Sequence, residues 1–153
     1  MSSAASRATA DGGQKKGRPN GHSLFSRVSP FYMTTTNEIV TSFYARIESK
    51  DFDGVRKLLH DDLQVQDPMG DLDSADKLIG KLTQASSVTE SFRMKHVFVD
   101  GDRASCVYDL ITATPIRESR FSEYFEIREG RIASIRVHYD SQPWIALYAE
   151  HSG

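Results

Sequence analysis

The spacing of apolar residues changes once along this 153-residue chain, and that change limits the possible folds more than any single motif. Between residues 35 and 82, apolar residues recur every three or four positions, which is typical of amphipathic helices. Between residues 92 and 140 they alternate with polar residues, which is typical of strands that bury one face. Helices followed by a meander of long strands predict an α+β domain rather than a parallel α/β sheet.

Three helices are expected before the long strands, and local signals indicate where they begin. Thr35 and Glu38 have the spacing of a capping box at the start of the first helix. Asp51 can cap a second helix. After a short strand around residues 63–65, the third helix is expected from about Asp73.

Four long strands are expected at residues 92–99, 103–114, 118–128 and 131–140. Asp100-Gly101 and Glu129-Gly130 predict tight turns within this meander. Pro143 is expected to begin a short terminal segment with one helical turn. A long sheet that curls around a helix leaves a cone-shaped hollow with one open end, where a small hydrophobic ligand would bind.

Residues 1–33 differ in composition from the rest of the chain. They are rich in Ser, Ala and Gly, and five basic residues against one acidic residue give them a net charge of +4. We expect a disordered basic tail here and a folded domain at residues 34–153. Several Arg and Ser with little acid are also compatible with a transit peptide, and Met33 would make a natural start.

Charge and hydropathy narrow the class of partner. Because the whole chain has a net charge of −2, the residues after 33 carry −6, which does not favour binding to nucleic-acid phosphates. No apolar run approaches the roughly 20 residues of a membrane span. The single cysteine, Cys106, suits a reducing compartment. We therefore expect a cytoplasmic protein that binds neither nucleic acid nor membrane.

Glu123 is the first candidate functional residue, because alternation places it on the buried face of its strand. It shares that face with Phe121, Phe125 and Ile127. A carboxyl group in such surroundings should have a raised pKa and could donate a hydrogen bond to a developing oxyanion. The alternative is a structural role, in which Glu123 pairs with an inward Arg or caps a buried backbone group.

Asp67 and Tyr44 are the other two polar candidates. Asp67-Pro68-Met69-Gly70 has the composition of a type I turn, so Asp67 is either a turn-initiating residue or a general base at the rim of the hollow. Tyr44 lies on the apolar stripe of the first helix. It is either a core tyrosine or a hydrogen-bond donor that faces the ligand.

The remaining residues expected to bind substrate share the inward face of the predicted strands: Phe92, Met94, His96, Phe98, Phe121, Phe125, Ile135 and Tyr139. His96 is either a neutral core histidine or a catalytic acid–base group. Together with His138 and Asp140 it does not form a compact metal-binding spacing, so no metal site is expected.

The order of elements and two short motifs resemble the NTF2-like superfamily, in particular its ketosteroid isomerase and SnoaL-like branch. Residues 51–70, which end in Val-Gln-Asp-Pro-Met-Gly, are similar to a segment of ketosteroid isomerases. Residues 125–132 and the His-Tyr-Asp at 138–140 are similar to the last hairpin of SnoaL-like proteins. The resemblance covers most of residues 34–145. It implies a cone-shaped α+β barrel, with three N-terminal helices packed on a curved antiparallel sheet.

The resemblance also implies a chemistry. The isomerase base would fall on Asp67, the tyrosine of the first helix on Tyr44, and the second, protonated acid on Glu123, where this chain has Glu instead of Asp. The implied activity is proton transfer, without metal or organic cofactor, on a steroid-, terpenoid- or polyketide-like substrate. Isomerisation, cyclisation, dehydration and epoxide opening all occur on this fold. The alternative is a non-catalytic module that binds a ligand or another protein.

A homodimer is expected from the face of the sheet opposite the predicted core. Val97, Val99, Val107 and Ile111 alternate with the predicted core residues and would lie on that face.

Overall fold

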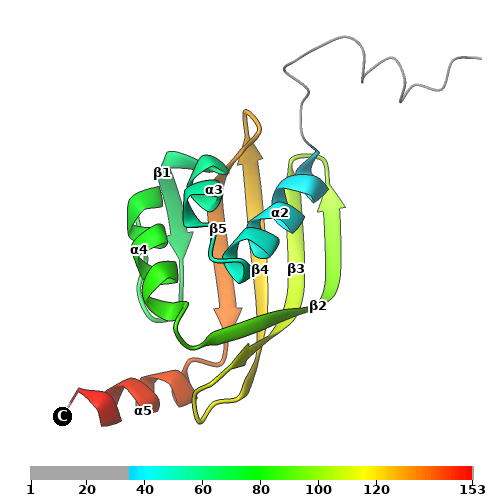
Figure 1. Cartoon of the computed structure of the whole chain (residues 1–153). Helices are drawn as coiled ribbons and strands as arrows, with labels where there is room; N and C mark the ends of the chain where they lie inside the picture. Colours follow the sequence, from blue (N-terminus) through cyan, green and yellow to red (C-terminus); the bar gives the residue numbers. More distant parts are fainter. Residues whose placement is uncertain (1–34, 153) are drawn as a thin grey trace, which may run out of the picture. The chain divides into compact units, whose positions relative to one another are not determined.

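A computed structural model describes residues 35–152, in which the first three helices lie on one face of a five-stranded sheet and the last helix extends from its end (Figure 1). The elements in chain order are α2 Thr36–Glu48, α3 Phe52–Lys57, β1 Leu59–Gln66, α4 Ala75–Ala85, β2 Thr89–Asp100, β3 Arg103–Thr112, β4 Glu118–Arg128, β5 Arg131–Tyr139 and α5 Gln142–His151. The predicted α+β class is confirmed. The tail expected at residues 1–33 lies outside the described residues.

Side chains predicted to cap the helices do so. The Thr35 hydroxyl accepts a hydrogen bond from Glu38 N at 3.2 Å, and the Asp51 carboxylate accepts one from Gly54 N at 2.9 Å. The third helix begins at Ala75, close to the expected start at about Asp73, and its N-cap Ser74 accepts a hydrogen bond from Lys77 N at 3.2 Å. Each cap satisfies a backbone N–H that the first helical turn leaves without a partner.

The described residues contain four helices instead of three, because the chain forms α5 after the last strand. Pro143 lies in the first turn of α5, where its missing N–H removes no helical hydrogen bond. Trp144 anchors this turn, since its side chain is buried and its Nε1 donates to Ser119 Oγ at 3.1 Å. No helix within residues 35–152 is both long enough and apolar enough to cross a membrane.

The sheet has the strand order β1-β5-β4-β3-β2 and is open at both edges. Strands β2 to β5 form the predicted antiparallel meander, whereas β1 pairs with β5 in parallel. The sheet is therefore mixed and not purely antiparallel as expected. A parallel pair requires a long crossover between its strands, and here α4 and three strands separate β1 from β5 in the chain.

A β-bulge at Lys95 reverses the facing of the second half of β2. Met94 pairs with Tyr108 but His96 pairs with Val107, so Lys95 has no direct partner on β3. An extra residue shifts the alternation of side chains by one position. The inner face is the one that carries Ala104, Cys106 and Tyr108 on β3, which are all buried.

This shift corrects two predictions from the sequence. Val97 and Val99 pair with buried residues of β3 and lie on the inner face, not on the predicted dimer face. His96 and Phe98 lie on the outer face, where Phe98 is 62% exposed and the two rings stack at 5.7 Å.

The core lies between the inner face of the sheet and the helices. Helix α2 packs on β2 and β3, and α4 packs on β1 (Figure 1). Except for Thr112, the most deeply buried side chains are apolar and come from α2, α3 and all strands except β2: Ile39, Val40, Val55, Leu59, Leu63, Cys106, Phe125 and Ile132. Of the buried polar residues, Thr112 donates to Ile116 O and Asp109 pairs with Arg120, whereas Glu123 lies on the inner face of the sheet and marks the candidate site.

Candidate functional site

Glu123 lies on the inner face of β4, as the alternation of its strand predicted. It pairs directly with Cys106 on β3 and with Val137 on β5, and it is only 8% exposed. Burial raises the pKa of its carboxyl group to about 7, because the charged form loses its hydration. Both the acid and the carboxylate are therefore accessible near neutral pH.

Tyr108 is the hydrogen-bond partner of Glu123. Its hydroxyl donates a hydrogen bond to Glu123 Oε1 within the buried interior. Burial, and then the negative charge of Glu123, raises the pKa of Tyr108 well above its ordinary value, so this phenol remains a donor. The sequence analysis did not select Tyr108. The alternation of the strand could have selected it, because Tyr108 lies two residues after Cys106 and therefore on the same face.

Tyr44 contributes a third polar group from helix α2. It is 5% exposed, and its hydroxyl has no hydrogen-bond partner of normal geometry among residues 35–152. Its ring lies edge-on to Tyr108 at 5.2 Å between centroids. Burial, and then the charge of Glu123, raises the pKa of Tyr44 well above its ordinary value. The site therefore contains a neutral O–H donor next to Glu123 with no acceptor.

Asp67 occupies the predicted turn at the end of β1. Its carbonyl accepts from Gly70 N at 3.0 Å, and its Oδ1 accepts from Met69 N at 2.8 Å, which are contacts of a turn-initiating Asp. The same carboxylate is also directed into the molecule, since its side chain is only 7% exposed. The Tyr139 hydroxyl donates to Oδ1 at 2.7 Å. Lys81 Nζ lies 3.0 Å from Oδ2.

The three residues predicted to be catalytic lie near one another. The negative charge of Asp67 adds to the rise in the pKa of Glu123, whereas the hydrogen bond from Tyr108, the adjacent Tyr44 hydroxyl and the positive charge of Lys81 oppose it. A stack of aromatic rings connects the two carboxylates. Tyr139 stacks on Phe121 at 4.3 Å, and Phe121 stacks on Tyr108 at 5.5 Å.

The residues predicted to bind substrate divide into three groups. Phe125 and Ile135 are buried in the core, and Phe92 and Phe121 are partly buried against it. Tyr139 contacts Asp67, and Met94 is at the edge of the core, partly exposed. His96 and Phe98 were expected on the same inner face, and this is wrong because of the bulge at Lys95.

Aromatic side chains fill much of the expected hollow. A pocket of about 180 Å³ lies between α2 and β2, and its lining is mainly apolar: Val40, Thr41, Tyr44, Ala45, Glu48, Phe92, Met94 and Val97. A second pocket of about 300 Å³ lies against β1 and the start of α4, lined by Gln64, Val65, Gln66, Asp71, Leu72, Asp73 and Lys77. Of the candidate catalytic residues, Tyr44 lines the first of these two pockets, and neither Asp67 nor Glu123 lines either of them.

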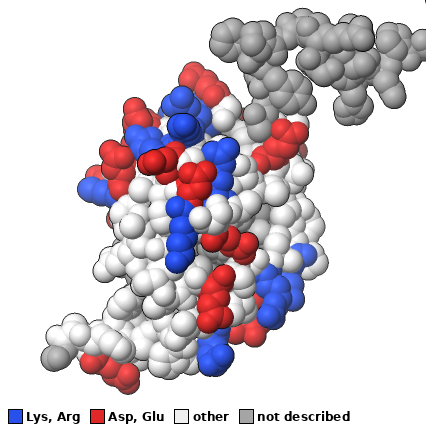
Figure 2. Space-filling view, viewed as in Figure 1, with Lys and Arg blue, Asp and Glu red and all other residues white. Residues whose placement is uncertain are grey.

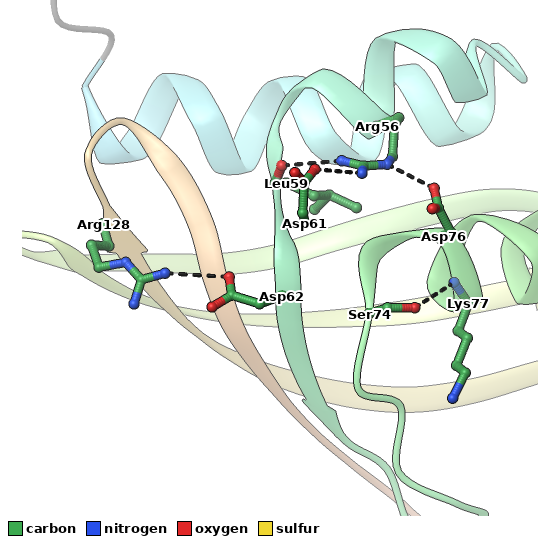
Figure 3. A network of polar contacts seen from close by, with 8 residues as sticks. All are labelled: Arg56, Leu59, Asp61, Asp62, Ser74, Asp76, Lys77 and Arg128. Carbon is green, nitrogen blue, oxygen red and sulfur yellow. Dashed lines mark hydrogen bonds and ion pairs between the residues drawn. The ribbon is translucent and has the colours of Figure 1, made fainter.

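Charged side chains outside the site form surface networks. Arg56 on α3 bridges Asp61 on β1 at 2.6 Å and Asp76 on α4 at 2.9 Å, and Arg128 pairs with Asp62 at 3.3 Å (Figure 3). Acidic and basic side chains are interspersed on the face in Figure 2. Such exposed pairs contribute little to stability individually, and they join elements without entering the interior.

Comparisons with known proteins agree with this architecture. Residues 40–135 match the SnoaL-like domain. No curated protein matches the sequence significantly. An NTF2-like protein of unknown function from Cytophaga hutchinsonii has a similar structure, with a TM-score of 0.65 at 19% identity, covering 72% of this chain and 95% of that one.

Two further structures with the same fold carry functional names. A candidate polyketide cyclase from Sinorhizobium meliloti has a TM-score of 0.61 at 20% identity, covering 65% of this chain and 93% of that one. A candidate ketosteroid isomerase from Kribbella flavida has a TM-score of 0.62 at 10% identity, covering 68% of this chain and 76% of that one. At these identities the likeness shows the fold alone. With its family match over most of the folded part, this chain belongs to the SnoaL-like domain family and has an NTF2-like fold.

Proposed function

We propose that this protein binds a small hydrophobic carbonyl compound and transfers protons on it without a cofactor, in the manner of ketosteroid isomerases. The observation that carries the proposal is a buried carboxyl group, Glu123, whose pKa is about 7, next to a buried phenol, Tyr44, that has no acceptor among residues 35–152. Buried groups of this kind are costly to a fold and are concentrated at functional sites.

The chemistry follows from the state of each group. A carboxyl group with a pKa near the working pH can both take up and return a proton. Glu123 would remove a proton from the carbon next to the carbonyl and return it at another carbon, while the double bond shifts between them. The Tyr44 hydroxyl would donate a hydrogen bond to the oxygen on which negative charge develops. Tyr108 would hold Glu123 in place through its hydrogen bond.

Asp67 has a different proposed role from the one that the family resemblance implies. Its carboxylate already accepts from Tyr139 and Met69 N and is paired with Lys81. Both carboxylate oxygens therefore already have partners, which leaves Asp67 less free than Glu123 to take a proton from a ligand. We therefore assign the proton transfer to Glu123 and keep Asp67 as the competing base, to be decided by mutation.

The α2–β2 pocket supports a small ligand. Its volume is about 180 Å³, and it reaches the ring of Tyr44. An apolar cavity of about 150 Å³ in another protein holds benzene. A single-ring ketone is therefore the first ligand to test. Because Glu123 does not line this pocket, the ketone would have to displace aromatic side chains to meet the carboxyl group, and a larger steroid- or polyketide-like substrate would have to displace more of them.

The test uses 3-cyclohexen-1-one, a single-ring ketone whose conjugated isomer is detected by its ultraviolet absorbance, and a panel of cyclic ketones for exchange of α-protons in D₂O by NMR. Glu123→Gln is expected to lower the rate by about 100-fold or more, the size of a general acid–base contribution. Glu126→Gln is the matched control, because Glu126 lies on the outer face of the same strand. A comparable loss in Asp67→Asn alone would transfer the role of base to Asp67.

The second candidate function is a non-catalytic module, and the filled interior favours it. If no ketone of the panel reacts faster than in buffer while a phenol binds with Tyr44-dependent NMR shifts, the protein is a ligand-binding module. The homodimer, the cytoplasmic location and the absence of a cofactor remain predictions. For the dimer, Phe98, Val107 and Ile111 now define the outer face, and Phe98→Asp with sedimentation velocity tests it.

A further inference from the structure

We propose that Lys81 is a positioning residue: it pairs with the buried carboxylate of Asp67 and thereby balances the negative charge that Glu123 meets from this side of the interior. This inference rests on the proposed function, in which Glu123 is the proton-transfer group. Neither Lys81 nor its helix was a candidate from the sequence.

The geometry joins a surface cation to an interior carboxylate. Lys81 lies on α4, with its side chain 45% exposed, and its Nζ is 3.0 Å from Oδ2 of Asp67. The Asp67 side chain is almost entirely buried and receives two more donors on Oδ1, from Tyr139 and Met69 N. Asp67 therefore has one charged partner among the described residues, and removing Lys81 leaves a buried carboxylate without a compensating charge.

A chain of contacts joins the pair to Glu123: Tyr139 donates to Asp67 and stacks on Phe121, and Phe121 stacks on Tyr108, which donates to Glu123. The pair acts on Glu123 through its charges. The negative charge of Asp67 disfavours the carboxylate form of Glu123, and the positive charge of Lys81 favours it. Because the two charges are adjacent, they largely cancel at Glu123 while both are present. Four further groups bear on Glu123 or on the pair: Tyr44 from α2, Cys106 and Tyr108 from β3, and Tyr139 from β5.

The two partners should therefore have opposite effects when each is removed. Lys81→Met leaves the charge of Asp67 and is expected to raise the midpoint of the Glu123 titration. Asp67→Asn leaves the charge of Lys81 and is expected to lower it. Each shift should be about half a pH unit or more, the size of a charge effect in a partly buried site. The double variant should return close to the wild-type midpoint.

The measurement is the titration of the Glu123 side-chain carboxyl in the full chain labelled with ¹³C at glutamate, assigned with Glu123→Gln. Lys77→Met is the matched control, because Lys77 lies one turn earlier on α4 and forms an exposed pair with Asp73 at 2.6 Å. It should leave the Glu123 midpoint unchanged. Lys81→Arg, which keeps the positive charge, should stay near wild type.

Shifts in the same direction for Lys81→Met and Asp67→Asn, or equal effects of Lys81→Met and Lys77→Met, would overturn the proposal. If Lys81→Met does not fold, Asp67→Asn is compared with the double variant, because the two differ only in the Lys81 charge. The Glu123 midpoint must then be lower in Asp67→Asn, which keeps this charge. The titration needs no substrate. Opposite shifts without turnover of any ketone would therefore reject the proposed function and leave the role of Lys81 standing.

Discussion

The Tyr108 hydroxyl donates a hydrogen bond to Glu123 Oε1 across two neighbouring strands, and both side chains face helix α2. The Tyr44 hydroxyl lies beside them and has no hydrogen-bond partner in the described part of the chain. One buried tyrosine is thus satisfied and the other is not, although both are aromatic residues of the same core. This difference leads to opposite expectations for removing each hydroxyl.

Tyr44→Phe is expected to increase the free energy of unfolding by about 1 kcal/mol, because it removes a buried hydroxyl that has lost its water without gaining an acceptor. The same change should weaken binding of a phenol or ketone ligand. Urea denaturation followed by tryptophan fluorescence gives the stability, and NMR titration gives the binding. A destabilised Tyr44→Phe variant would mean that the hydroxyl has a partner in solution.

Tyr108→Phe is expected to raise the pKa of Glu123 above about 7, because the hydrogen bond from Tyr108 stabilises the carboxylate. ¹³C titration of the glutamate carboxyl groups measures this directly. Unlike Tyr44→Phe, the variant should not gain stability at pH 5, because the hydroxyl that it removes has a hydrogen-bond partner in the wild-type protein. A fall in the pKa of Glu123 would contradict the role given to this hydrogen bond.

Stability should depend on pH through Glu123. Its pKa rises from 4.5, the ordinary value, to about 7 in the folded protein, so the folded state holds a proton that the unfolded chain has released between these values. Protonation of Glu123 therefore adds roughly 3 kcal/mol to the free energy of unfolding. This contribution is complete below pH 4.5 and is lost as the pH rises to 7. Unfolding of wild type and Glu123→Gln from pH 4 to 8 measures the difference.

At pH 4 the free energies of unfolding of Glu123→Gln and wild type differ by a reference amount. As the pH rises from 4.5 to 7, the free energy of the variant should rise relative to wild type beyond that amount, because only wild type loses the contribution of the Glu123 proton. Glu126→Gln, on the outer face, should run parallel to wild type throughout. Parallel curves for all three proteins would show that Glu123 does not titrate in this range.

The bulge in β2 can be tested by a pair of charges. Val97→Asp places a carboxylate on the inner face and should destabilise the fold by about 2 kcal/mol or more. Phe98→Asp places it on the exposed outer face and should change stability by less than about 0.5 kcal/mol per protomer. Urea midpoints decide between the two faces. If Phe98→Asp destabilised the protein more than Val97→Asp, β2 would have no bulge and would follow the uninterrupted alternation expected from the sequence.

Local signals in the sequence account for most of the elements. Thr35 and Asp51 cap their helices as predicted, because a side chain needs to reach only three residues ahead to satisfy a backbone N–H. The Glu129-Gly130 turn also forms as predicted, with positive φ at both residues. At the other turn, the central residues are Gly101 and Asp102 instead of the expected Asp100 and Gly101. Of these two residues, only Gly101 has positive φ.

By itself, the sequence determined the α+β class and the facing of Glu123. The alternation around Glu123 is uninterrupted, so one buried neighbour fixes the facing of the others. Only the tertiary structure decided the facing of His96 and Phe98, because a bulge is a property of the pairing between two strands. The contacts of Glu123 with Tyr108 and of Asp67 with Lys81 and Tyr139 also required it. Each joins two elements that only the packed sheet and helix bring within hydrogen-bond distance.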